Sequence, residues 1–196
     1  MRASSREWVL ERVRGALNGR AGVAHPGFLK TEVPEELLLG FQERFTKSGG
    51  EVVRCDAPGN AGAWLGSFLR TLESESPTVT IGSGVPPAWM PDIATVAPAD
   101  AAVGVSVACG AAADTGSLLL ESTGKRAVQL LPPIHIVWLP TARIFPRLHD
   151  ALEAQANALP ATIGIHSGPS KSADIGRTVV TGVHGPGRII AVVVEG

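Results

Sequence analysis

The residues between 167 and 187 form the chain's densest group of side chains suited to binding a small molecule. One small-residue loop reads Ser167-Gly168-Pro169-Ser170-Lys171-Ser172-Ala173-Asp174, and a second reads Gly182-Val183-His184-Gly185-Pro186-Gly187. Hydroxyls, an ammonium group and loop amides can hold an anion, and histidine titrates near neutral pH. Because such loops fill a core poorly, we predict that this stretch is one wall of a small-molecule site.

Each charged or titratable residue of these loops has an expected role. Lys171 supplies positive charge, and Ser172 would cap one or two helical turns over residues 172–178, whose dipole also attracts anions. Asp174 would orient the lysine or a hydroxyl, or act as a base. His184, presented by a glycine loop, is the expected proton donor or acceptor. The alternative is a capped turn with a solvated lysine.

Two shorter stretches are further candidates for ligand binding. Gly82-Ser83-Gly84 follows an apolar strand, and its glycines would let the backbone approach a ligand, although a plain structural turn is the favoured interpretation. Asp114-Thr115-Gly116-Ser117 places an acceptor and hydroxyls at the start of a strand, which fits either a site or an Asx-type turn.

The histidines are weaker signals when they are taken one at a time. His135 lies in an apolar strand, where a histidine is usually a packed, hydrogen-bonded core residue. His25, His149 and His166 are scattered, and surface or packing roles are favoured for them. No Ser-His-Asp motif order, metal motif or Walker loop is present.

Composition excludes several classes of function. The chain has 196 residues, a formal net charge of -1 and two cysteines, Cys55 and Cys109. Without a basic stripe, nucleic-acid binding is not expected. Two separated thiols cannot hold an iron–sulfur cluster, and no metal-ligand spacing is present, so no cluster or metal is expected on this chain. No stretch resembles a signal peptide or a membrane span, which predicts a cytoplasmic protein.

The elements that must position these residues follow from periodicity and breakers. Helices are expected at residues 4–17, from Pro34 to the Gly49-Gly50 pair, and at 61–72 and 144–158. Strands are expected at residues 51–55, 78–81, 117–121, 134–139, 162–165 and 189–194, with weaker candidates at 93–96 and 102–107. Continuous apolar strands separated by helices predict an α/β fold with a largely parallel sheet covered on both faces. We expect one domain over residues 1–196, with a helical part at 1–74 and the ligand-site core at 75–196.

The strings ADTGSLLLES, LLPPIHIVWLP and SGPSKSADIGRTVVTGVHGPG resemble motifs of the lactate-utilisation protein C family (LutC/YkgG, the LUD domain) over roughly residues 75 to 196. The resemblance implies a fold similar to the NagB/RpiA/CoA-transferase group, with ligand loops at strand ends. It also implies a part in L-lactate oxidation to pyruvate together with iron–sulfur partner proteins, which would carry the clusters. The motif positions of this chain are Asp114, Thr115, Gly116, His135, Ser167, Gly168, Pro169, Ser170, Ser172, Ala173, Asp174, Gly182, His184 and Gly185.

Two positions depart from the family pattern. Gly176 stands where an acidic residue is common, and Ser117 replaces a frequent threonine but keeps the hydroxyl. The leading hypothesis is a small-anion site formed by the Asp114 loop, residues 167–174 and His184. Asp114 and Asp174 would position hydroxyls or serve as bases. Two alternatives are a non-catalytic scaffold for iron–sulfur partners and an independent enzyme of the CoA-transferase or sugar-phosphate-isomerase type, in which Glu121 would be the nucleophile.

Overall fold

The computed structural model describes residues 5–18, 32–72, 77–122, 126–173 and 179–195. The chain divides into two compact units, Met1–Lys30 and Thr31–Gly196. The first contains α1 (Ser5–Leu17), a helix without buried residues. Its apolar side chains Trp8, Val9, Val13 and Leu17 are all about half exposed or more. Among the described helices, none has the length and apolar content needed to cross a membrane.

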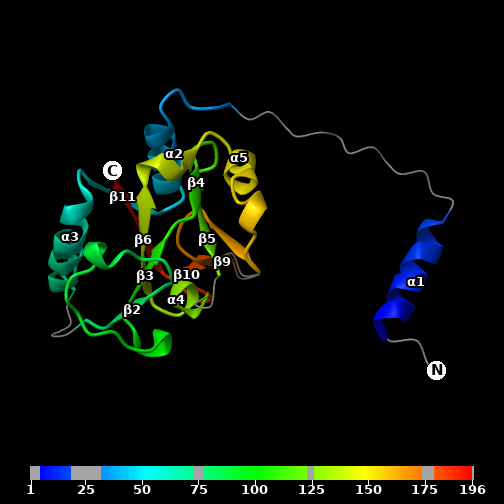
Figure 1. Cartoon of the computed structure of the whole chain (residues 1–196). Helices are drawn as coiled ribbons and strands as arrows, with labels where there is room; N and C mark the ends of the chain where they lie inside the picture. Colours follow the sequence, from blue (N-terminus) through cyan, green and yellow to red (C-terminus); the bar gives the residue numbers. More distant parts are fainter. Residues whose placement is uncertain (1–4, 19–31, 73–76, 123–125, 174–178, 196) are drawn as a thin grey trace. The chain divides into compact units, whose positions relative to one another are not determined.

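A parallel five-stranded sheet forms the centre of the second unit, in the strand order β1-β11-β6-β3-β2 (Figure 1). Its strands are β1 (Glu51–Cys55), β2 (Val79–Ile81), β3 (Val103–Val107), β6 (Ile134–Pro140) and β11 (Arg188–Val194). All four strand pairs are parallel. The central strands are apolar at nearly every position, because both faces of the sheet are covered. The α/β fold with a parallel sheet is confirmed.

Different layers cover the two faces of this sheet. α3 (Pro58–Arg70) packs on one face, where Trp64 contacts Trp138 of β6 at a ring separation of 5.9 Å. α2 (Leu37–Lys47) packs on the other face, where Phe41 and Phe45 are fully buried. A second, four-stranded sheet shares that side of the core, in the order β7-β4-β5-β8. Figure 1 shows α3 on one side of the central strands and α2 on the other.

The second sheet is mixed and its elements are short. Its strands are β4 (Gly110–Ala112), β5 (Ser117–Glu121), β7 (Ile144–Phe145) and β8 (Ile163–His166). The remaining elements are α4 (Arg126–Leu130), α5 (Leu148–Glu153), the hairpin strands β9 (Lys171–Ala173) and β10 (Val179–Thr181), and 3-10 turns at Pro87–Trp89, Pro98–Asp100, Thr141–Arg143 and Ala156–Ala158. β5 pairs antiparallel with both β4 and β8. This sheet brings residues 117 and 167 to one edge.

Four sequence predictions of local structure differ from the structure, and strand pairing or a proline accounts for three of them. Residues 144–145 pair with β4, and Pro146 delays the helix expected at 144–158 until Leu148. The helix expected from Pro34 starts at Leu37. The strand expected at 93–96, between two prolines, is reduced to one bridge, Val79 to Thr95. Lys171–Ala173 is a strand where helical turns were expected from Ser172, and residues 174–178 lie outside the described part.

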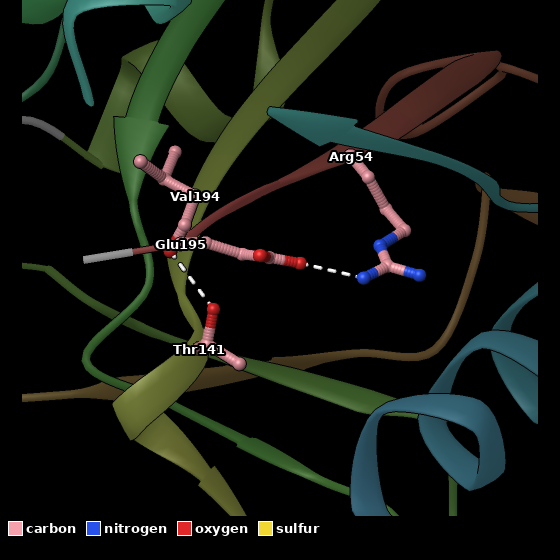
Figure 2. A network of polar contacts seen from close by, with 4 residues as sticks. All are labelled: Arg54, Thr141, Val194 and Glu195. Carbon is pink, nitrogen blue, oxygen red and sulfur yellow. Dashed lines mark hydrogen bonds and ion pairs between the residues drawn. The ribbon is translucent and has the colours of Figure 1, made fainter. Parts of the chain in front are cut away.

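Polar contacts close the carboxyl edge of the central sheet where β11 ends. Arg54 donates to Glu195 at 2.6 Å, and the Thr141 hydroxyl donates to the carbonyl of Val194 at 3.0 Å (Figure 2). The Glu195 amide also donates to the Cys55 carbonyl at 3.0 Å. These contacts join β1, β6 and β11 at the end where their carbonyls would otherwise lack partners.

Replacing Gly116 by alanine should destabilise the second unit. Gly116 has φ +62°, and an added Cβ would lie 2.5 Å from the Phe45 amide nitrogen and 2.7 Å from the Arg44 carbonyl carbon of α2. We expect a loss of about 3 kcal/mol or more in the free energy of unfolding, measured by urea denaturation, because backbone strain and overpacking add. The matched control is Gly59→Ala, at an open position in α3, which should leave stability unchanged or raise it slightly. Equal urea midpoints for Gly116→Ala and Gly59→Ala would contradict the close contact between Gly116 and α2.

Candidate functional site

A small pocket lies where β6 and β11 begin, at the amino edge of the central sheet. Its volume is about 210 Å³, and its lining combines loop residues with the floor of the sheet: Leu130, Ile165, His166, Ser167, Gly168, Ser170, His184, Gly185, Pro186 and Ile189. This volume is several times that occupied by one water molecule in liquid water, and it is smaller than a typical pocket for a drug-sized ligand. The pocket therefore suits a ligand of a few non-hydrogen atoms.

The two predicted loops meet at this pocket because their backbones are hydrogen-bonded to each other. The Ser170 amide donates to the Pro186 carbonyl at 2.9 Å, and the Gly182 amide donates to the Ser170 carbonyl at 2.9 Å. β9 and β10 extend the pairing as an antiparallel hairpin. Gly168, at φ +146°, lies so close to α2 that an added Cβ would be 2.8 Å from the Ser48 carbonyl oxygen. Loop pairing and this contact hold Ser167, Ser170 and His184 around one volume.

A chain of hydroxyls connects the pocket to the Asp114–Ser117 stretch. The Oγ atoms of Ser117 and Ser167 are 2.8 Å apart, and the Ser117 Oγ donates to Thr115 Oγ1 at 2.8 Å. Ser117 is buried, whereas Ser167 lines the pocket. The pairing of β5 with β8 makes this contact possible across fifty residues of sequence. Because the Ser117 proton goes to Thr115, the Ser167 hydroxyl donates to Ser117, so Ser167 presents its oxygen as an acceptor to the pocket.

Two histidines lie together behind the pocket. His135 is fully buried, its Nε2 is 3.0 Å from Ser106 Oγ, and its Nδ1 has no hydrogen-bond partner among the described residues. Its ring lies 6.2 Å from that of His166, at 70°. Burial, and then the charge of a protonated His166, lower the pKa of His135 to about 3. Burial, and then the positive charge of Arg126, lower the pKa of His166. Both rings are therefore neutral at pH 7.

Lys171 binds the end of a helix rather than the pocket. Its Nζ donates to the Ser48 carbonyl at 2.6 Å, at the carboxyl end of α2, where a cation is favourable. It lines an adjacent open depression of about 430 Å³ that shares Ser167 and Gly168 with the pocket. Ser172 lies in β9, paired with Val180. Lys171 can therefore favour anion binding through its nearby positive charge, without contacting the anion directly.

The structure does not bring every predicted site residue to the pocket. The Asp114 carboxylate accepts a hydrogen bond from the Leu148 amide at 3.0 Å, at the start of α5. Gly82 and Ser83 follow β2, where the Gly82 amide donates to the Val105 carbonyl at 2.8 Å. Gly116 packs against α2. Asp174 lies outside the described residues. Glu121 ends β5, and its carbonyl accepts from Gln129 at 2.7 Å.

Sequence reasoning missed three contributors to this region. His166, for which a surface or packing role was favoured, lines the pocket. Ser106 of β3 binds His135, and Leu130 of the unpredicted helix α4 closes one side. The position of His166, directly before Ser167 at the end of a strand, was the one available signal. Ser106 and Leu130 are brought to this region by strand order and packing, which the sequence does not reveal.

The pocket offers hydrogen-bond donors without a negative charge. No described residue that lines it is an aspartate or glutamate. Arg188, at the start of β11, is committed to Glu51 through contacts of 2.6 and 2.8 Å. The described residues contain no cluster of three or more His, Cys, Asp or Glu side chains that could hold a metal ion. Serine hydroxyls, imidazoles and loop amides in a partly enclosed space suit a small carboxylate or another small anion.

The burial of His135 predicts how stability depends on pH. Because its pKa is about 3 in the folded chain and about 6.5 in the unfolded chain, the unfolded state takes up a proton first as pH falls. Its contribution to stability is complete above pH 6.5 and is lost toward pH 3, by at most about 1.4 kcal/mol per pH unit. Urea midpoints of the wild type and His135→Gln should therefore converge as pH falls from 7.5 to 5.

A variant of a second histidine is the control for this prediction. An NMR titration replaces the urea measurements if the His135 variant does not fold. His149→Gln, on the exposed side of α5, should keep the pH dependence of the wild type. If His135→Gln does not fold, NMR titration of the wild-type imidazoles gives the pKa directly. A His135 titration midpoint near 6.5 would contradict the burial argument.

Comparisons with known proteins identify the family to which this arrangement belongs. A family model described as the LUD domain matches residues 97–194, half of the chain. The lactate utilization protein C of Geobacillus kaustophilus is 30% identical over 193 residues, covering 91% of this chain and 76% of that protein. The protein of the same name from Halalkalibacterium halodurans is 39% identical over 101 residues, 47% of this chain and 44% of that protein.

Shorter and structural matches agree with this result. An uncharacterized protein of Neisseria meningitidis is 39% identical over 83 residues, and the match spans 40% of this chain and 35% of that protein. The chain thus matches less than half the length of two of these relatives. The crystal structure of a DUF162 family protein from Deinococcus radiodurans superposes with a TM-score of 0.61 at 20% identity, covering 81% of this chain and 96% of that one, which shows the shared fold. On the evidence of the family model and of the Geobacillus relative, which aligns over 91% of this chain, this chain belongs to the LUD domain family.

Proposed function

We propose that this chain is a lactate utilization protein C type component that takes part in the oxidation of L-lactate to pyruvate, and that it binds a small carboxylate in the pocket between the two loops. The names of two relatives, one aligned over 91% of this chain, support the lactate-utilisation role. The pocket supports the ligand class. Its volume of about 210 Å³ suits an acid of few atoms, and its described lining carries no carboxylate that would repel one.

The observation that carries the proposal is the convergence of Ser167, Ser170 and His184 on one pocket. Hydroxyls and exposed amides of a tight loop hold a carboxylate through charge-assisted hydrogen bonds. Because Ser117 donates to Thr115, the Ser167 hydroxyl donates to Ser117, and Ser170 is the serine that supplies a donating hydroxyl to the carboxylate. Lys171, 2.6 Å from the Ser48 carbonyl, adds positive potential beside the pocket and need not contact the ligand.

His184 is the proposed proton donor or acceptor. It lines the pocket on a loop between Gly182 and Gly185, and a histidine exchanges protons readily near neutral pH. Conversion of L-lactate to pyruvate releases two electrons and two protons. We propose that iron–sulfur partner subunits accept the two electrons, while this chain holds the acid, His184 accepts one proton and the second proton passes to solvent. The pocket lies within residues 75–196, the proposed ligand-site core, and α2 supports it from the preceding part.

Loss of a loop donor should weaken the binding of L-lactate to the purified chain. Removing a hydrogen bond to a charged group costs enough to lower affinity at least about tenfold. We therefore expect Ser170→Ala and His184→Ala each to show this loss in calorimetric titrations with L-lactate, with little change in unfolding midpoint. Ser67→Ala on α3 and His149→Ala on α5 are the matched controls, because neither residue lines the pocket.

The same titrations test the main alternative, a scaffold without a ligand. If L-lactate and pyruvate give neither heat nor a thermal shift with the wild type, while the chain still co-purifies with iron–sulfur subunits, the ligand site is refuted and a scaffold role is supported. Equal affinities for L-lactate in all four variants and the wild type would also refute this pocket as the site.

A further inference from the structure

We propose that His166 reads the 2-hydroxyl group of a hydroxy acid, accepting its hydrogen on an imidazole nitrogen while the loop residues hold the carboxylate. This inference rests on the proposed function, that the pocket binds a small carboxylate. It adds which substituent beside the carboxylate is recognised and which residue recognises it.

The place of His166 in the chain suits this role. It is the last residue of β8 and lines the pocket directly beside Ser167, whose hydroxyl is fixed by Ser117 at 2.8 Å. In a 2-hydroxy acid the hydroxyl-bearing carbon is bonded to the carboxylate carbon. The groups that hold the carboxylate and the hydroxyl must therefore lie close together, as Ser170 and His166 do on the lining of one small pocket.

The pocket is short of hydrogen-bond acceptors, and His166 is suited to supply one. The described lining contains no carboxylate or amide side chain, so its side-chain acceptors are limited to hydroxyl oxygens and imidazole nitrogens. Burial and the charge of Arg126 lower the pKa of His166, so its ring stays neutral and keeps one bare nitrogen. No hydrogen bond joins this ring to another side chain in the described part of the chain. His184, by contrast, is exposed on its loop.

The ring of His166 is held in place from two sides. An added Cβ on Gly164 would lie 2.7 Å from His166 Nε2, so the imidazole rests over this glycine on the same face of β8. The His135 ring lies edge-on at 6.2 Å from the other direction. Because His135 is itself neutral at pH 7, it brings no charge to the pair. A ring held in this way can discriminate between ligands without first becoming ordered.

The test compares two acids that differ only in the hydroxyl group. Calorimetric titration of the wild type with L-lactate and with propionate should show L-lactate binding about three- to tenfold more tightly, the value of one hydrogen bond. His166→Leu should lower the affinity for L-lactate and leave that for propionate nearly unchanged, which brings the ratio close to one. His166→Asn, which keeps an acceptor, should restore part of the ratio.

A glycine variant tests the position of the ring without removing it. Gly164→Ala places a methyl group 2.7 Å from His166 Nε2, so the ring must move and the ratio of affinities should fall. Gly59→Ala, at an open position in α3, is the matched control and should keep the wild-type ratio. This variant also keeps the inference testable if His166→Leu does not fold.

The outcomes separate this inference from the proposed function. If the wild type binds L-lactate but His166→Leu weakens L-lactate and propionate equally, His166 does not read the hydroxyl and the inference is overturned, while the lactate site stands. An unchanged ratio in both His166→Leu and Gly164→Ala overturns it as well. If the wild type binds neither acid, the proposed function fails and this inference fails with it.

Discussion

The parallel pairing of β6 with β11 holds the centre of the second unit together. It runs over seven residue pairs, from Ile134 opposite Arg188 to Pro140 opposite Val194. Both strands are buried on both faces, so a shift by one residue would exchange the side chains that face α3 with those that face the second sheet. The same register sets His135 of β6 opposite Ile189 of β11, and Ile189 lines the pocket.

The second sheet completes the candidate site beside β6 and β11. Its strand β5 pairs with β8, so Ser117 meets Ser167 and the ring of His166 meets that of His135. Burying such polar groups is costly unless they find partners, and most of them do through Ser106, Ser117 and Thr115. The Nδ1 of the fully buried His135 has no partner among the described residues.

The position of the pocket is unusual for a parallel α/β sheet, in which ligands generally bind beyond the carboxyl ends of the strands. Here the carboxyl edge is closed by contacts of Arg54 with Glu195 and of Thr141 with Val194. The pocket instead opens at the amino edge, where the loop before β11 bonds to the loop after β8. The candidate site is therefore formed by the loop that leads into β11 of the central sheet together with the loop that follows β8 of the second sheet.

The central strands, most helices and the two loops that carry Ser167, Ser170 and His184 could be predicted from the sequence, because apolar runs and glycine-serine clusters are local signals. The sequence also supported the family, through motifs that the comparisons bear out. Three placements could be seen only in the folded chain: Asp114 accepts from the Leu148 amide at the start of α5, Lys171 binds the end of α2, and His166 lines the pocket. Each of these depends on which strands are neighbours, and strand order follows from burial summed over the whole sheet rather than from any local stretch of residues.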